Sequence, residues 1–205
     1  WPTTINNPTT TYAYSNLTTT TLFRTVVQNS VCGYAYATPV TITVNPQTVA
    51  GTLASGATVC TGNNNGTLTL SGYTGNIIRW ESSTDGGATW PGTISNTSNT
   101  HSFTDLTTTT LFRAVVHSGV CNAVKSNDVT ITVNPQTVPG TLAANATVCT
   151  TGNTGTLTLS GHTGNLIHWE LSPYNGASWT HTTTPSHPLT SPPFPTPPPT
   201  RLFLP

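Results

Sequence analysis

The feature that most constrains the fold is an internal repeat with an interval of 89 residues, because a fixed interval of this length is typical of an array of similar modules. Five tryptophans and all four cysteines follow the same interval. This many matches in one register cannot arise by chance. The matching stretches are "LTTTTLFR" at 17–24 and 106–113, "TITVNPQTV" at 41–49 and 130–138, and "GTLTLSG" at 66–72 and 155–161.

The boundary between modules is best placed in "NPQTV", which occurs at 45–49 and again at 134–138. Proline cannot donate a hydrogen bond to a sheet, and its fixed φ stiffens a short linker. The chain begins and ends inside repeats, so we expect a piece of a longer protein. The predicted segments are the back half of a module at 1–48, a complete module at 49–137, the front part of a third at 138–179, and a Pro/Thr-rich irregular segment at 180–205.

The composition predicts an all-β protein. Threonine accounts for 48 of the 205 residues, while only 5% of residues are charged, against about 25% in a typical soluble domain. Threonine, valine and aromatic residues favour strands. About seven short alternating strands in 89 residues predict tandem immunoglobulin-like β-sandwich modules. The alternation places Ile78 beside Trp80 on the inward face, with Arg79 and Glu81 outward. The predicted core residues are Trp80, Leu68, Leu70, Phe112 and Ile131.

The charge pattern limits the partners of the chain. Five basic and five acidic side chains cancel, so there is no basic patch to bind nucleic acid. The sequence also contains no apolar run near the roughly 18 residues needed to span a bilayer. We therefore expect neither a nucleic-acid partner nor a membrane span.

The stretch "STDGGATW" at 83–90 resembles the Asp-box of sialidases and other β-propeller proteins. A sialidase would need several such boxes at blade spacing, yet the next copy, 89 residues on, reads "SPYNGASW". An aspartate that starts a turn accepts backbone hydrogen bonds, and glycines supply positive φ. We therefore interpret the stretch as a structural hairpin formed by Asp85, Gly86, Gly87 and Trp90.

The remaining residue patterns do not indicate catalysis. Acid–base catalysis of glycosidic bonds needs two carboxylates close together, and the five acids here are scattered singly. The histidines do not recur at the repeat interval, and no short metal-ligand spacing is present. We expect a non-enzyme without a cofactor or metal site. Exposed aromatic residues on strands leave a carbohydrate-binding platform as an alternative.

Two cysteines in each module predict one disulfide per module and an oxidising environment. We favour Cys60–Cys121, because a bond across a linker would have to span an extended final strand. The alternative pairs Cys32 with Cys60 and Cys121 with Cys149. The half-modules at the two ends also suggest that copies of the chain can complete one another head to tail, with Cys149 near the neighbour's Cys32.

The stretches "ATVCTGNNNGTLTLSG", "IIRWESSTDGGATW", "LTTTTLFRAVVHSGVC" and "VTITVNPQTV" resemble the tandem Ig-like repeats of large secreted surface proteins and adhesins of Bacteroidetes-type bacteria. The resemblance covers residues 1 to about 179. It implies export, through a type IX system, and a structural or adhesive role at the cell surface. Partners would be neighbouring modules or copies of the chain in a fibre, with surface glycans as a further candidate. The alternative function is a carbohydrate-binding accessory array of a secreted glycosidase.

Overall fold

The computed structural model describes residues 3–143, 146–172 and 176–182, and every regular element among them is a β-strand. The prediction of an all-β protein is therefore confirmed. The chain divides into two compact units, Trp1–Thr137 and Val138–Pro205. The predicted irregular segment at 180–205 lies outside the described residues from residue 183 onward.

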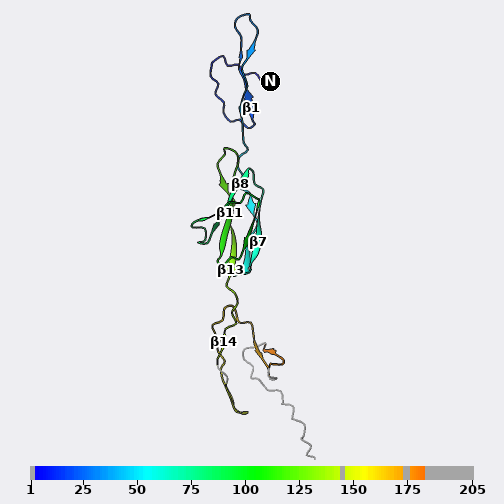
Figure 1. The fold of residues 1–205 in the computed structure, drawn as a ribbon, viewed down its shortest axis with the longest axis vertical. Coiled ribbons are helices and arrows are strands. Elements are labelled where there is room, and N and C mark those ends of the chain that lie inside the picture. Colours follow the sequence, from blue (N-terminus) through cyan, green and yellow to red (C-terminus); the bar gives the residue numbers. More distant parts are fainter. Residues whose placement is uncertain (1–2, 144–145, 173–175, 183–205) are drawn as a thin grey trace, which may run out of the picture. The chain divides into compact units, whose positions relative to one another are not determined.

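The centre of the first unit consists of two sheets (Figure 1). All pairings within them are antiparallel except that of β6 with β13, which is parallel. The smaller sheet has the order β10-β7-β5, formed by β5 (Thr52–Leu53), β7 (Asn65–Ser71) and β10 (Thr100–Thr104). The larger has the order β6-β13-β11-β8-β9, with β12 beside β11, formed by β6 (Ala57–Cys60), β8 (Asn76–Ser83), β9 (Gly92–Ile94), β11 (Thr110–His117), β12 (Val124–Lys125) and β13 (Val129–Asn134).

The hydrophobic core lies between these two sheets, as in a β-sandwich. In β7, Leu68 and Leu70 are buried while Thr67 and Thr69 are exposed, which is the alternation expected of a strand with one face on the core. Both sheets contribute to one continuous cluster. Its members are Leu53, Leu68, Leu70, Ile77, Trp80, Phe103, Phe112, Ala114, Val116, Val129 and Ile131.

One predicted inward residue, Ile78, is exposed, and Ile77 takes its place in the core. The pairing of β8 with β11 shifts between Val115 and Val116, where Val115 faces Arg79 and Val116 faces Ile77. Ile78 is the extra residue of this β-bulge. A bulge reverses the inward and outward positions on one side of itself, so strict alternation from Trp80 gave the wrong residue.

The first part of this unit forms two separate strand pairs, β1 (Thr21–Phe23) with β4 (Val40–Ile42) and β2 (Val26–Val27) with β3 (Ala35–Tyr36). The second unit contains β14 (Thr141–Leu142) paired with β15 (Leu159–Ser160), and β16 (Trp169–Leu171) paired with β17 (Thr180–Thr182). Many large hydrophobic side chains are exposed in both stretches.

Candidate functional site

The hairpin that follows β8 is built around the carboxylate of Asp85. Ser83 Oγ donates to Asp85 Oδ1 at 2.6 Å, and Thr89 donates to Asp85 Oδ2 through its backbone N at 2.9 Å and its Oγ1 at 2.5 Å. Ser83 is itself buried, and its Oγ accepts from the backbone N of Gly87 at 3.0 Å. Gly86 and Gly87 have φ of 74° and 90°, which L-residues with a side chain rarely adopt. The Asp85 carboxylate therefore closes the turn with its own neighbours.

These hydrogen bonds determine the ionisation of Asp85. The Ser83 hydroxyl and then the Thr89 hydroxyl and backbone N–H hold the pKa of the carboxyl far below its usual range. A carboxylate that accepts several hydrogen bonds is stabilised in its charged form. It is a poor general acid or base near neutral pH. The chemistry of this group suits a permanent turn anchor.

Beside the hairpin, three charged side chains of the larger sheet form a cluster with Trp90. Arg113 Nε donates to Glu81 Oε2 at 2.7 Å, and Arg79 Nε donates to Glu81 Oε1 at 2.8 Å. The Arg113 guanidinium also lies over the Trp90 ring, 3.7 Å from its centroid. Trp90 is fixed in turn, because its Nε1 donates to the backbone O of Gly87 at 3.1 Å. We call Arg79, Glu81, Trp90 and Arg113 the arginine cluster.

Glu81 points away from the core as predicted, but it is not solvated. It is buried beneath the two arginines. Burial alone raises the pKa of this carboxyl, and the hydrogen bonds from Arg113 and then Arg79 outweigh it, so the pKa is lowered. The signal that could have revealed the cluster is a set of opposite charges, Arg79, Glu81 and Arg113, on one outward face.

Part of this local arrangement also occurs in the second unit. Ser172 Oγ accepts from the backbone N of Gly176 at 3.0 Å, as Ser83 Oγ does from Gly87. Glu170 Oε1 lies 3.2 Å from His168 Nε2, and these residues stand 89 positions after Glu81 and Arg79. Tyr174, which replaces Asp85, lies outside the described residues. The serine–glycine hydrogen bond is therefore found without an aspartate at the second turn position.

The four cysteines are free thiols. Cys60 ends β6 level with Asn134, the last residue of β13, whereas Cys121 follows the far end of β11. β11 runs antiparallel to β13 and begins beside Ile131. The length of β11 therefore separates Cys60 from Cys121 along the sheet by roughly 20 Å, at about 3.3 Å per residue. A disulfide needs Cα atoms within about 7 Å. The predicted Cys60–Cys121 disulfide is therefore wrong.

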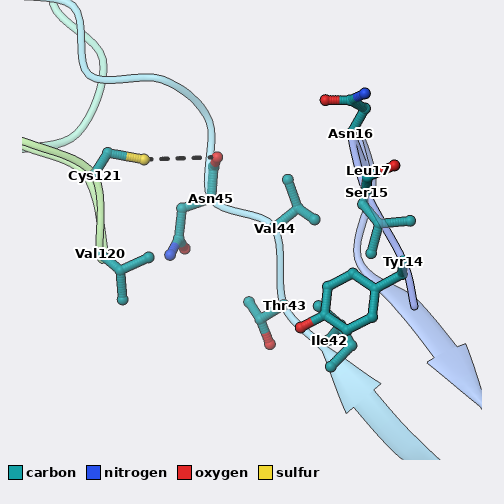
Figure 2. Close-up of a pocket in the computed structure, with 10 residues that line it drawn as sticks. All are labelled: Tyr14, Ser15, Asn16, Leu17, Ile42, Thr43, Val44, Asn45, Val120 and Cys121. Carbon is teal, nitrogen blue, oxygen red and sulfur yellow. Dashed lines mark hydrogen bonds between the residues drawn. The ribbon is translucent and has the colours of Figure 1, made fainter. Parts of the chain in front are cut away.

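Cys121 lies instead in an open groove where the linker reaches the sandwich (Figure 2). Its Sγ lies 3.5 Å from the backbone O of Pro46 and 3.9 Å from that of Asn45. The groove offers backbone carbonyls, hydroxyls and one thiol, and none of its lining residues is a carboxylate, lysine, arginine or histidine. The lining residues are Tyr14, Ser15, Asn16, Leu17, Ile42, Thr43, Val44, Asn45, Val120 and Cys121.

The described residues outside the hairpin and the groove include no grouped metal ligands. Within 3–143, 146–172 and 176–182, no three His, Cys, Asp or Glu side chains are grouped closely enough to hold a metal ion. The same stretches contain no helix with the length and apolarity to cross a membrane. The aromatic ring of His101 packs against Trp80 and Phe112, with centroids 5.4 Å and 5.3 Å away, and burial lowers its pKa. This histidine is a core-edge residue.

Comparison with known families gives one result. A family model described as "Domain of unknown function (DUF8696)" matches the chain in three stretches, at residues 1–46, 49–135 and 138–193. The second and third stretches begin 89 residues apart. No curated protein matches the chain.

Proposed function

The chain belongs to the DUF8696 family, and from that premise we propose that it is a non-enzymatic segment of a secreted bacterial surface protein. In this proposal, Ig-like modules joined by short Asn-Pro linkers act as a structural and adhesive array. The parent protein is a cell-surface adhesin or filament of the type exported by Bacteroidetes-type bacteria through a type IX system.

The strand order of the middle module supports an Ig-like fold. In Ig notation, β5, β7 and β10 correspond to strands A, B and E, and β8, β9, β11 and β13 to C, C′, F and G. Trp80 on β8 is fully buried, as is the tryptophan on strand C of Ig domains. Ig domains of antibodies add a disulfide between strands B and F, whereas here neither β7 nor β11 contains a cysteine.

The observation that carries the proposal is the recurrence of local structure at the repeat interval. The pairing of Thr21 with Ile42 in β1 and β4 recurs as Thr110 with Ile131 in β11 and β13. The bridge of Val49 with Thr74 recurs at Val138 with Thr163. Repeated units joined by short linkers suit a spacer or fibre.

The ionisable groups with described contacts are consistent with a structural role. Asp85 anchors a turn, and Glu81 joins two arginines on neighbouring strands. One face of the Trp90 ring is covered by the Arg113 guanidinium, so a sugar ring cannot stack on that face. That contact favours the structural array over the carbohydrate-binding alternative.

Two measurements test the proposal. Antibodies raised against the chain should label the outer surface of intact source cells in immunogold electron microscopy, and label confined to the cell interior would contradict it. A glycan array probed with the purified chain distinguishes the alternatives. Binding at micromolar affinity to a defined glycan would favour a carbohydrate-binding accessory array, whereas surface labelling without glycan binding supports the structural array.

A further inference from the structure

The strand β10 ends the smaller sheet and has an open edge. Among the residues that the structure describes, β7 is the only strand paired with β10. β10 has five residues, whereas the other strands that end the two sheets, β5, β6 and β9, have two, four and three. An end strand presents unpaired backbone N–H and C=O groups to any further strand. β10 is therefore the longest stretch of the middle module to which another strand can be added.

The register of β10 with β7 identifies the backbone groups at this edge. Leu70 N donates to Asn99 O at 2.8 Å, and Asp105 N donates to Asn64 O at 2.7 Å. Hydrogen-bonded positions alternate along an antiparallel pair. The odd-numbered residues from 99 to 105 therefore turn their N–H and C=O groups toward β7, and the even-numbered residues turn theirs to the open edge. The even-numbered residues of β10 are Thr100, Ser102 and Thr104.

Few features of the chain protect this edge. Asn96 Nδ2 donates to Thr100 O at 2.8 Å, but within the described ranges no hydrogen bond reaches the backbone groups of Ser102 or Thr104 from the open side. Proteins commonly protect an edge strand with proline, a charged side chain or a β-bulge. β10 reads "THSFT", and its register with β7 is unbroken. Burial lowers the pKa of His101, so the strand is uncharged at neutral pH.

The backbone of β10 is complementary to that of a second copy. In an antiparallel pair of two β10 strands centred on Ser102, each Ser102 N–H donates to the C=O of the opposite Ser102. Thr100 of each strand then lies opposite Thr104 of the other, and these residues also exchange N–H to C=O hydrogen bonds. In this arrangement Thr100 O exchanges its Asn96 donor for the Thr104 N–H. Every outward-turned backbone group of β10 then has a partner.

The side chains match under the same pairing. Phe103 is buried on the core side of β10 and stacks on Phe112, with ring centroids 6.2 Å apart. His101 lies on that side too, 5.3 Å from the Phe112 ring. His101 of one strand would face Phe103 of the other, and aromatic cross-strand pairs stabilise a sheet. On the outer face the exposed hydroxyl side chains meet one another. A partner strand must therefore alternate hydroxyl and aromatic residues without charge, as β10 itself does.

We propose that β10 of one copy of this chain pairs antiparallel with β10 of another, which joins two three-stranded sheets into one continuous sheet. Such a two-fold interface uses the same patch on both copies. The patch lies within the middle module and involves neither end of the sequence. This inference rests on the proposed function as a module array and deepens it, because modules that pair side by side would bundle neighbouring arrays laterally.

Sedimentation velocity of the full chain tests the pairing. We expect the average sedimentation coefficient of the wild-type chain to rise with concentration. Ser102→Lys should weaken association at least about tenfold, because two lysines would lie directly opposite each other across the interface. Thr67→Lys is the matched control, since Thr67 is exposed on the same face and in register with Ser102, but belongs to the inner strand β7. A wild-type chain that stays monomeric, or two variants that behave alike, would overturn the proposal.

A charge exchange tests the two-fold register itself. Ser102→Lys and Ser102→Asp chains should each associate weakly alone, whereas an equal mixture should recover at least the wild-type association, because opposite charges then face each other. Recovery also shows that both variants are folded. A mixture that associates no better than the separate chains contradicts pairing centred on Ser102. Immunogold labelling judges the proposed surface role separately, so a surface-labelled chain that fails these tests would contradict the β10 pairing alone.

Discussion

The arginine cluster allows a prediction in which exposure determines the strength of each charge pair. Glu81 bonds to two arginines at similar distances, 2.7 Å for Arg113 and 2.8 Å for Arg79. The Arg113 side chain is only 12% exposed and the Arg79 side chain 38%. A hydrogen bond to a charged group contributes about 1.5–3 kcal/mol when covered, whereas a solvent-exposed pair contributes about 0.2–1 kcal/mol. We therefore expect Glu81→Gln to lower the free energy of unfolding by about 2–3 kcal/mol, most of it through Arg113.

Two double-mutant cycles separate these contributions. Glu81→Gln combined with Arg113→Met should show a coupling energy of at least about 1.5 kcal/mol, and combined with Arg79→Met less than about 1 kcal/mol. The assay is chemical denaturation followed by tryptophan fluorescence, at pH 7 and again at pH 3. Equal couplings, or an Arg113 coupling below about 0.5 kcal/mol, would refute the argument that burial decides the strength of the pair.

The pH comparison has a definite sign. The pKa of Glu81 is lowered in the folded chain, because the hydrogen bonds from Arg113 and Arg79 outweigh its burial. The unfolded chain therefore binds more protons than the native chain as the pH falls through the ordinary glutamate pKa of about 4.3. The stabilisation is present above that pH and is lost progressively below it. A coupling energy with Arg113 that is as large at pH 3 as at pH 7 would contradict this assignment.

Three further predictions concern single positions. Asp85→Ala should lower the melting temperature more than Asp85→Asn, which keeps one acceptor for Thr89; equal melting temperatures in a thermal melt would contradict the anchor role. Because burial lowers the pKa of His101, stability should fall as the pH drops below about 6.5, and His101→Tyr should remove that part of the pH dependence in thermal melts. A Cβ at Gly66 would lie 2.4 Å from the Phe103 ring, whereas one at Gly155 has nothing within 4 Å; denaturation should show a loss of about 1–3 kcal/mol for Gly66→Ala and less than about 0.5 kcal/mol for Gly155→Ala.

The parts of the fold that could be predicted depend on local signals. Leu68 and Leu70 alternate with threonines, so their burial follows from the two-residue period of a strand. The hairpin at Asp85 was predictable for the same reason, because aspartate and two glycines specify a turn through bonds to residues at most four positions away. Such features require no knowledge of which strands are neighbours.

The features that the sequence pattern did not give depend on partners distant in the sequence. The exposure of Ile78 results from a bulge against β11, a strand more than thirty residues later. The burial of Glu81 results from Arg113 on that same strand and from Trp90 beyond the turn, which holds Arg113 in place. A strand pattern read one residue at a time gives the face of a side chain, but not what covers that face.

The cysteines show why module boundaries and bond partners are separate questions. Two cysteines per repeat suggested one bond per repeat, and this reasoning treated each module as a closed unit. The ladder between β6 and β13 places Cys60 at the outgoing linker, and the loop after β11 places Cys121 at the incoming linker. The two thiols lie beyond opposite ends of β11. The spacing of cysteines along the chain therefore gave their number in each repeat, but not the distance between them in the fold.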